Sequence, residues 1–375
     1  MQLRRFGKTN LELSVFSLGT MRCLANPQNS RQTISKAIAL GINHIETASG
    51  YGQSENYLGQ ALKELATRRD QVYLTTKLPP TPDPHQMRLG LEKSLARLQV
   101  DYIDCLAIHG INTWEHFNWI TDPDGCLVPL QKAREEGKIR HIGFSTHGSL
   151  DLILATINTD LFDFINLHYY YFFQRHQAAI ALAAEKDMGV FIISPGDKGG
   201  KLYNPPPLLE ALCSPLTPLE LTYRFLFSDR RITTLSVGAA YPEELITPLQ
   251  VNQAEALTNQ EEEILAKLDA HLTQTLKSDL CRQCYQCLPC PEEINIPEIL
   301  RLRNLTVAYQ MQEYGQYRYG MLENAGHWFP GKKGDRCTDC GDCLPRCPEK
   351  LNIPDLLRDT HQRLKGKQSR RLWSS

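Results

Sequence analysis

Residues 44–48 read His44-Ile45-Glu46-Thr47-Ala48, a short strand-like run, and the stretch Gln53–Thr67 that follows has the pattern of an amphipathic helix. The same alternation of a short β-branched run with a longer amphipathic stretch passes through eight rounds between about residue 12 and residue 272. This pattern is typical of a parallel sheet covered by helices. The predicted strands are Val15–Leu18, His44–Ala48, Val72–Lys77, Ile103–His109, Ile139–Ser145, Phe164–Tyr169, Val190–Ser194 and Thr233–Gly238.

Eight βα units within roughly 250 residues favour a closed (β/α)8 TIM barrel over an open doubly wound sheet. The dinucleotide-binding fingerprint of the open fold is missing, because Leu18-Gly19-Thr20-Met21-Arg22 follows the first strand in place of Gly-x-Gly-x-x-Gly. Ahead of that strand, Arg5–Asn10 has the character of a turn within a short hairpin. We expect this hairpin to plug the lower end of the barrel.

The composition argues against several classes of partner. The 375-residue chain has a formal net charge of -1, so no long-range field attracts nucleic acid or an anionic membrane, and we expect neither partner. No apolar run approaches the roughly 20 residues of a membrane-spanning helix, and the opening Met1–Phe6 lacks the apolar region of a secretory signal. The expected location is the cytoplasm.

The twelve cysteines are unevenly distributed, since four are scattered over residues 23–213 and eight lie between Cys281 and Cys347. In a reducing cytosol, such clustering favours metal ligation over disulfides. The sequence also becomes rich in proline and short helical patterns after about residue 276. We therefore predict a barrel over residues 1–275 and a small, mainly α-helical, metal-binding domain over residues 276–375.

The late cysteines form two runs with the spacing of iron-sulfur ligands. The second run, with Pro348 after it, has the bacterial ferredoxin spacing C-x2-C-x2-C-x3-C-P, in which three thiolates bind one cubane and the fourth binds another. The first run has the same design and is one residue shorter before its last cysteine. The predicted ligands of one [4Fe-4S] cluster are Cys281, Cys284, Cys287 and Cys347, and those of the other are Cys337, Cys340, Cys343 and Cys290. A pair of zinc sites is the alternative, since CxxC pairs also bind zinc.

The two runs belong to an internal repeat. Residues 290–301 read Cys-Pro-Glu-Glu-Ile-Asn-Ile-Pro-Glu-Ile-Leu-Arg, and residues 347–358 read Cys-Pro-Glu-Lys-Leu-Asn-Ile-Pro-Asp-Leu-Leu-Arg. The second proline of each copy, Pro297 or Pro354, suits the first turn of a helix, and the acidic residue after it favours the helix dipole. Because residues 291–336 form a long spacer between the runs, the segment resembles the helical ferredoxin modules of succinate dehydrogenase and heterodisulfide reductase.

Polar residues end successive strands of the predicted barrel, where barrel enzymes carry their chemistry. Glu46, Lys77 and His109 close or nearly close strands two, three and four, and Tyr51 follows strand two. A nearby ammonium stabilises a phenolate and makes tyrosine a better acid. A carboxylate keeps the lysine charged, and an imidazole can hydrogen-bond a carbonyl. The four residues therefore predict a proton donor suited to carbonyl reduction.

These residues match the Asp-Tyr-Lys-His tetrad of the aldo-keto reductases, and residues 3–272 resemble that family. The resemblance also rests on Arg5–Thr9, Gly41–Gly52 and Arg140–Ser145. The whole chain resembles the bacterial subgroup of the family that carries a C-terminal ferredoxin-type extension.

The resemblance implies NADPH or NADH as cofactor. It assigns Ser145, Thr146 and Asn166 to the carboxamide of the nicotinamide, and the loop Ser194–Gly199 to the pyrophosphate. Within this region the candidate cofactor contacts are Ser194, Gly196 and Lys198, and Gly238 offers a backbone donor after the last strand.

The chain departs from the family pattern at three positions. Glu46 replaces the usual aspartate, Ile193 replaces the aromatic residue that stacks on the nicotinamide, and Glu244 stands where an arginine commonly binds the 2'-phosphate.

The leading hypothesis is an enzyme that reduces a small aldehyde or ketone with NAD(P)H, with Tyr51 as the proton donor and His109 orienting the carbonyl. Nicotinamides exchange electrons in pairs and each cluster passes one, so the clusters point to a redox protein partner, or to a structural or sensing role. The alternative is an electron-transfer or redox-sensing protein in which the barrel binds a cofactor or partner without aldo-keto reductase turnover.

Overall fold

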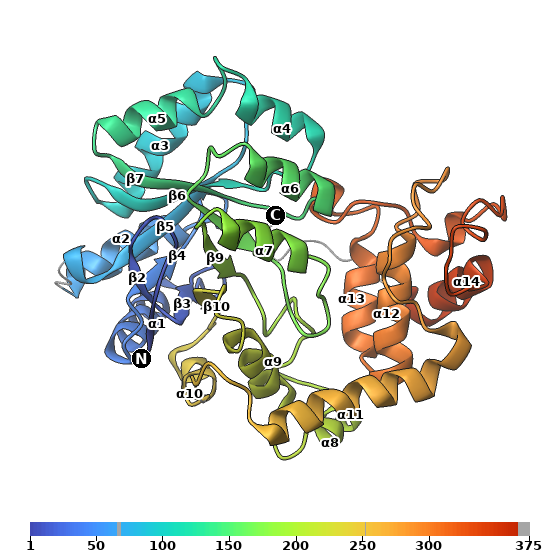
Figure 1. Ribbon diagram of the computed structural model, residues 1–375. Helices are drawn as coiled ribbons and strands as arrows, with labels where there is room; N and C mark the ends of the chain where they lie inside the picture. Colours follow the sequence, from blue (N-terminus) through green and yellow to red (C-terminus); the bar gives the residue numbers. More distant parts are fainter. Residues whose placement is uncertain (66–68, 252, 367–375) are drawn as a thin grey trace. The chain divides into compact units, whose positions relative to one another are not determined.

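The computed structural model describes residues 1–65, 69–251 and 253–366, and its central feature is a closed barrel of eight parallel strands (Figure 1). Neighbouring strands follow the order β10-β3-β4-β5-β6-β7-β8-β9. This confirms the predicted (β/α)8 fold and not the open doubly wound sheet. The strands are β3 (Phe16–Gly19), β4 (His44–Glu46), β5 (Tyr73–Leu78), β6 (Ile103–His109), β7 (Ile139–Ser145), β8 (Phe164–Leu167), β9 (Gly189–Ile192) and β10 (Thr234–Val237).

All eight predicted strands are present, and β6 and β7 have the predicted bounds. Strand β4 is shorter than predicted and ends at Glu46. Its pairing with β5 nevertheless continues in two backbone hydrogen bonds, since the Thr47 amide donates to the Thr75 carbonyl at 2.8 Å and the Ser49 amide to the Lys77 carbonyl at 3.0 Å. The chain therefore stays attached to β5 beyond the end of the strand.

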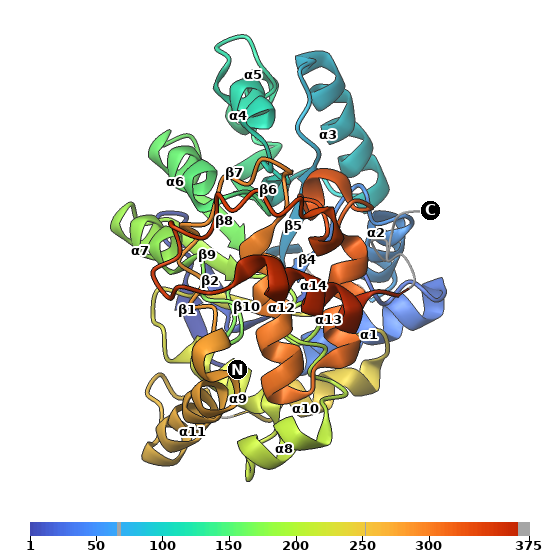
Figure 2. The same ribbon diagram turned by 90° about the vertical axis from the view of Figure 1, so that its right-hand side faces the viewer.

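Helices surround the strands (Figures 1 and 2), and α3 (Pro84–Leu98) shows why they form. Asp83 caps its first turn, and its apolar residues Met87, Leu91, Leu95 and Leu98, which recur with helical spacing, are buried. In the described ranges, no helix is both long enough and apolar enough to cross a membrane. The other helices from the first strand of the barrel to the end of its last connection are α1 (Pro27–Ala39), α2 (Ser54–Glu64), α4 (Trp114–Thr121), α5 (Val128–Glu135), α6 (Leu150–Asn158), α7 (Gln177–Glu185), α8 (Pro207–Cys213), α9 (Pro218–Phe227) and α10 (Ile246–Leu249).

The predicted hairpin is present and plugs the barrel as expected. Strands β1 (Leu3–Arg5) and β2 (Glu12–Ser14) pair antiparallel. The apolar side chains Phe6, Leu11 and Leu13 are buried against inward residues of β6, β8 and β9. The hairpin thereby closes the core at the end of the barrel opposite the carboxyl ends of the strands.

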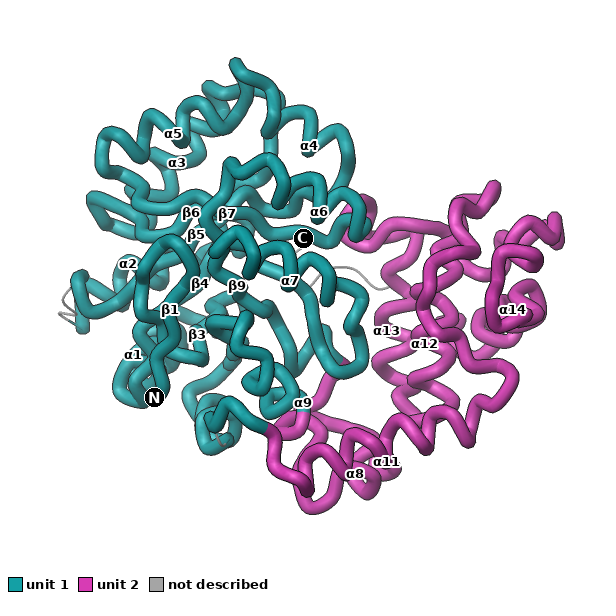
Figure 3. Tube along the Cα trace, in the orientation of Figure 1, with its two compact units in different colours: residues 1–199, 222–256 teal, residues 200–221, 257–375 magenta. Residues whose placement is uncertain are grey.

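Two compact units divide the chain, residues 1–199 with 222–256 and residues 200–221 with the chain from residue 257 onward (Figure 3). The second unit contains α8, α11 (Asn259–Leu276), α12 (Ile296–Tyr309), α13 (Gln312–Met321) and α14 (Ile353–Leu364). Helix α11 packs on α12, where the Tyr309 hydroxyl donates to the Leu268 carbonyl at 2.9 Å. The packing of the chain therefore changes near residue 257, whereas its composition changes near residue 276.

The internal repeat produces equivalent backbone structure in both copies. Helices α12 and α14 each begin at the isoleucine of Asn-Ile-Pro, with the proline in the first turn, as predicted. Ahead of them, Glu293 and Lys350 occupy matching positions with φ of 56° and 53°. The two copies are therefore alike in conformation as well as in sequence.

His44 forms a polar contact inside the barrel that depends on its neutral state. Its Nδ1 lies 2.6 Å from the Ser17 hydroxyl and its Nε2 lies 2.7 Å from the Thr75 hydroxyl. Burial lowers the pKa of His44 to about 3, and the charge of Lys77 acts in the same direction. The unfolded chain takes up this proton near pH 6.5, whereas the folded chain resists it.

We predict that His44→Gln reduces the acid sensitivity of the fold. Because the folded pKa is depressed, the contribution of His44 is present above pH 6.5 and is lost as pH falls toward 3. Between pH 7 and pH 5, wild type is expected to lose about 2 kcal/mol more unfolding free energy than the variant. Urea unfolding at the two pH values measures this difference, and equal losses in both proteins would contradict it.

Candidate active site and metal centres

The four predicted catalytic residues lie near the carboxyl ends of neighbouring strands. Glu46 ends β4, Lys77 is the penultimate residue of β5, and His109 ends β6. Tyr51 lies in the turn between β4 and α2. Because β4, β5 and β6 are consecutive in the barrel, these side chains meet at the rim that carries the chemistry of such folds.

Lys77 is the centre of the group and is 1% exposed. Its ammonium donates to the Tyr51 hydroxyl at 3.3 Å and to the Thr47 carbonyl at 3.0 Å. It also forms an ion pair with the Glu46 carboxylate. The longer arm of glutamate, compared with aspartate, therefore reaches the lysine.

Burial and the neighbouring carboxylate have opposing effects on the pKa of Lys77. Burial lowers the pKa of its ammonium well below the usual range, and the charge of Lys198 lowers it further. The Glu46 carboxylate acts in the opposite direction, because an adjacent anion favours the charged form. Breaking such a buried pair typically costs about 3–5 kcal/mol, so the pair holds the ammonium beside the phenol.

His109 completes the group. Its ring meets the Tyr51 ring edge-on, with centroids 5.6 Å apart and an interplanar angle of 83°. Both residues are buried, with 8% of their surface exposed. A phenol beside an ammonium and an imidazole can donate a proton to a bound oxygen while the lysine stabilises the phenolate left behind.

The residues assigned to the nicotinamide differ in how their side chains are occupied. Ser145 and Asn166 pair across β7 and β8, and the Ser145 hydroxyl accepts from the Gly110 amide at 3.1 Å. The Thr146 hydroxyl donates to the Ile111 carbonyl at 2.6 Å and braces its own loop. The Asn166 side chain is fully buried, and neither its amide nitrogen nor its oxygen has a hydrogen-bond partner among the described residues. Such a group fits a carboxamide, which offers both a donor and an acceptor.

The loop assigned to the pyrophosphate is a compact turn after β9. Ser194 has φ +53°, and its carbonyl accepts from the Lys198 amide at 3.0 Å. A Cβ at Gly199 would overlap the Pro195 carbonyl, so this tight turn requires glycine there. Gly196 is buried within the turn, and the charge of Lys198 is felt at Lys77. The loop thus brings a cation to the same rim.

Arg22 is a feature of this rim that the sequence did not indicate. Its guanidinium donates to the Gly238 carbonyl at 2.7 Å and pairs with Glu244 at 3.1 Å. Glu244 stands where an arginine is common in the family that the chain resembles, and Arg22, from the loop after β3, pairs with it. The sequence signal for Arg22 at this rim is its position in Leu18–Arg22, directly after the first strand.

A second unpredicted feature links the loops that follow β7, β8 and β9. The Tyr170 hydroxyl donates to the Ile193 carbonyl at 2.5 Å, so it accepts from Nδ1 of His168. The other ring nitrogen of His168 lies 3.1 Å from Nε2 of His147. His147 and His168 follow Ser145 and Asn166 by two residues in the chain and lie beyond the ends of β7 and β8.

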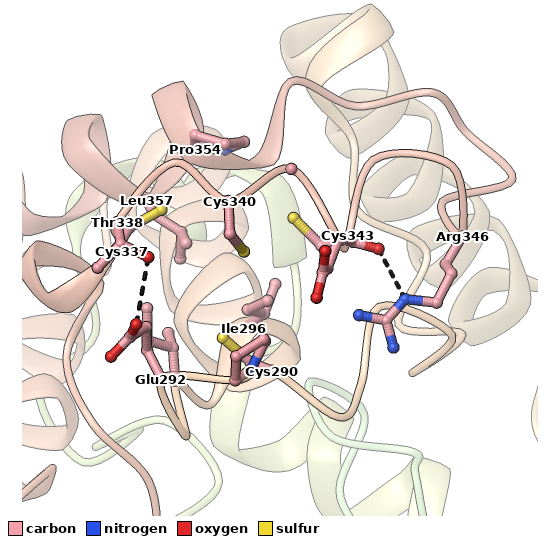
Figure 4. A pocket seen from close by; sticks show the side chains of 14 residues that line it. Cys290, Glu292, Ile296, Cys337, Thr338, Cys340, Cys343, Arg346, Pro354 and Leu357 are labelled. Atoms are coloured by element: carbon pink, nitrogen blue, oxygen red, sulfur yellow. Dashed lines mark hydrogen bonds between the residues drawn. The ribbon is translucent and has the colours of Figure 1, made fainter.

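The eight late cysteines line two cavities of similar size. One cavity is lined by Cys290, Cys337, Cys340 and Cys343 (Figure 4). The other is lined by Cys281, Cys284, Cys287 and Cys347. The structure thus brings together the same two groups of thiols that the spacing predicts, including the exchange of the last cysteine between the runs.

The geometry of the thiols bears on what they can hold. Among the described residues, no three histidine, cysteine, aspartate or glutamate side chains are placed to share one metal ion. A cubane needs no such convergence, since each thiolate binds a different iron. Burial raises the pKa of the Cys287 thiol to about 12, and Cys281, Cys284 and Cys343 add to the shift.

Comparison with known families divides the chain in the same way. Residues 16–201 match the aldo/keto reductase family, and residues 280–351 match the 4Fe-4S dicluster domain. The first match contains Glu46, Tyr51, Lys77 and His109, and the second contains all eight late cysteines.

Individual relatives agree with the family matches. An uncharacterized oxidoreductase of Bacillus subtilis, YqkF, is 24% identical over 74% of this chain and 98% of its own length. The L-galactose dehydrogenase of Arabidopsis thaliana is 31% identical over 39% of this chain, which spans 48% of that protein. Among solved structures, the holo form of aldo-keto reductase AKR11C1 from Bacillus halodurans is 25% identical, with a TM-score of 0.63 over 71% of this chain and 96% of its own.

We predict that Asn166→Leu raises the free energy of unfolding. The variant removes a buried amide without partners, and a buried unpaired polar group typically costs about 1–3 kcal/mol. The matched control is Asn112→Leu, which removes the buried side-chain acceptor of the His147 amide and is expected to destabilise the fold. Urea unfolding of wild type and the two variants measures the three free energies of unfolding. Destabilisation by both variants would show that Asn166 is paired in solution.

Proposed function

Since the chain carries an aldo/keto reductase family domain ahead of a 4Fe-4S dicluster domain, we propose that this oxidoreductase uses NADPH or NADH to reduce a small aldehyde or ketone. The observation that carries the proposal is the buried contact of 3.3 Å between the Lys77 ammonium and the Tyr51 hydroxyl. A phenol in ordinary surroundings is a poor acid at pH 7, and this contact supplies the charge that stabilises its phenolate.

Each residue of the group has a distinct role in this proposal. A bound nicotinamide would supply the hydride that reduces the carbonyl carbon. Tyr51 donates its proton to the carbonyl oxygen, which yields the alcohol, and Lys77 stabilises the phenolate that remains. Glu46 keeps the lysine charged, and His109, beside the Tyr51 ring, hydrogen-bonds the oxygen and orients it.

Residues of the neighbouring strand ends hold the cofactor in this proposal. The unpartnered amide of Asn166, next to Ser145, suits the carboxamide, and Thr146 fixes the loop behind them. The turn Ser194–Gly199, including Gly196, receives the pyrophosphate with the charge of Lys198, and Gly238 contributes backbone on the other side. The Arg22–Glu244 pair places one guanidinium near Gly238, and the carboxylate beside it offsets its charge. Both NADPH and NADH are therefore proposed as cofactor.

The two thiol-lined cavities are proposed to hold two [4Fe-4S] clusters. Each cavity offers four cysteines, and apolar side chains complete its walls, among them Ile296 in one and Leu300 in the other. A cluster passes one electron and a nicotinamide exchanges two, so a redox protein partner is the proposed second participant. The proposed location is the cytoplasm, where thiols are kept reduced.

One observation favours the alternative, an electron-transfer or redox-sensing protein without carbonyl turnover. Ile193, at the position of the usual stacking aromatic, packs instead against the apolar core of the barrel. The nicotinamide ring would then lack its usual partner, and the barrel would bind a cofactor or partner without catalysing reduction.

We predict that Tyr51→Phe lowers kcat for carbonyl reduction by about 100-fold to 10,000-fold, the usual contribution of a general acid. The measurement is NAD(P)H oxidation with a panel of small aldehydes and ketones. Tyr57→Phe is the matched control, because Tyr57 is half-buried on α2 outside the group and is expected to leave kcat unchanged.

Equal rates in wild type and Tyr51→Phe would disprove the role of the phenol. Wild-type protein that binds NAD(P)H and turns over no carbonyl would support the alternative function instead.

We also predict about eight iron and eight sulfide ions per chain after anaerobic purification, since each cubane holds four of each. Cys287→Ala, which removes a buried thiol of one cavity, is expected to lose about half of the iron. Cys213→Ala is the control, because Cys213 is buried on α8 outside both cavities. Zinc without sulfide in the wild-type protein would establish the zinc alternative.

A further inference from the structure

The two copies of the repeat differ at one position beside the proposed clusters. Gln283 and Asp339 each lie two residues after the first cysteine of their run and one residue before the second. Their backbones are equivalent, with φ of 58° and 59°. A neutral amide in one copy therefore replaces a carboxylate in the other on the same local framework.

The Gln283 side chain is aimed at a predicted cluster ligand. Its amide nitrogen lies 3.3 Å from Sγ of Cys281 and 3.0 Å from the carbonyl of Pro297. The Pro297 carbonyl can only accept, so the atom between these two partners is the nitrogen. Because Pro297 lies in the first turn of α12, the helix holds the amide against the sulfur.

Asp339 makes no such contact, since a carboxylate carries no N–H group. Its Oδ1 instead accepts from the guanidinium of Arg358 at 2.6 Å, and Arg358 also binds Asp355. The repeat equivalent of Arg358 is Arg301, which is buried and pairs with Glu298 at 2.6 Å. Asp355 is the repeat equivalent of Glu298, so the exchange of Gln283 for Asp339 is accompanied by an additional partner for the arginine of the following helix.

The charged residues that line the two cavities also favour reduction in the cavity of Cys281 over reduction in the cavity of Cys337. The cavity of Cys337 is lined by two carboxylates, Glu292 and Asp342, and by the guanidinium of Arg346, for a net charge of -1. The cavity of Cys281 is lined by Arg282 and Glu349, for a net charge of zero. The negative charge makes an added electron less favourable in the cavity of Cys337. In the cavity of Cys281, the N–H···S bond makes an added electron more favourable.

We propose that the two clusters have different reduction potentials, and that the cluster bound by Cys281, Cys284, Cys287 and Cys347 has the higher one because Gln283 donates to Cys281. This inference rests on the proposed iron-sulfur function. An electron that enters the domain then resides on that cluster, and the cluster bound by Cys290, Cys337, Cys340 and Cys343 is the stronger reductant.

The test is a redox titration of the anaerobic full-length protein, followed by electron paramagnetic resonance. Wild type is expected to show two one-electron potentials separated by at least about 59 mV, the equivalent of a tenfold difference in the reduction equilibrium. Gln283→Leu is expected to shift the higher potential to more negative values and to leave the lower one unchanged. Gln316→Leu, on the exposed side of α13, is the matched control and is expected to shift neither.

Asp339→Gln is the reciprocal variant, which places an amide at the equivalent position and is expected to raise the lower potential. It keeps the test decisive should Gln283→Leu fail to fold. Two potentials closer than about 59 mV in wild type would overturn the inference, as would a Gln283→Leu protein with both potentials unchanged. Protein without iron and sulfide would instead contradict the proposed function itself, so the two failures are distinguishable.

Discussion

A lysine ammonium buried at the carboxyl rim of the barrel is the constraint on which the candidate active site depends. A buried charge requires a partner, and Glu46 provides it from the adjacent strand. The pair leaves the ammonium pointing at Tyr51, whose turn stays joined to β5 by backbone bonds. The hairpin plug at the opposite end fills the core, so the polar group occupies only the carboxyl end.

The second unit contains a repeated motif whose thiols line two cavities. Each copy supplies three thiols to one cavity and a fourth to the other, so neither cavity is complete without both copies. The helices after the repeats begin at the same Asn-Ile-Pro step and hold the cysteine loops in equivalent conformations. Divergence at Gln283 and Asp339 then changes the surroundings of the sulfurs without changing the framework.

Local signals explain what the sequence could predict. Strands β6 and β7 were predicted with correct bounds because each is a seven-residue run that ends at a polar residue, His109 or Ser145, and β6 is buried throughout. The predicted boundary at residue 276 places α11 with the barrel, because the apolar periodicity of this helix is the same whichever partner it packs against. Arg22 and Glu244 are more than 200 residues apart, so no local pattern reveals their pairing. The unpartnered state of Asn166 likewise depends on the surrounding fold and not on its neighbours in the chain.

The central claim is that the Lys77 charge makes Tyr51 an effective acid. The most direct measurement is the single-turnover rate of NADPH oxidation by a small aldehyde in the double variant Lys77→Met/Glu46→Gln, which removes both charges and leaves no unpaired ion in the barrel. We expect NADPH binding to persist and the rate to fall by about 100-fold or more. A rate equal to that of wild type, with NADPH bound as tightly, would contradict the account.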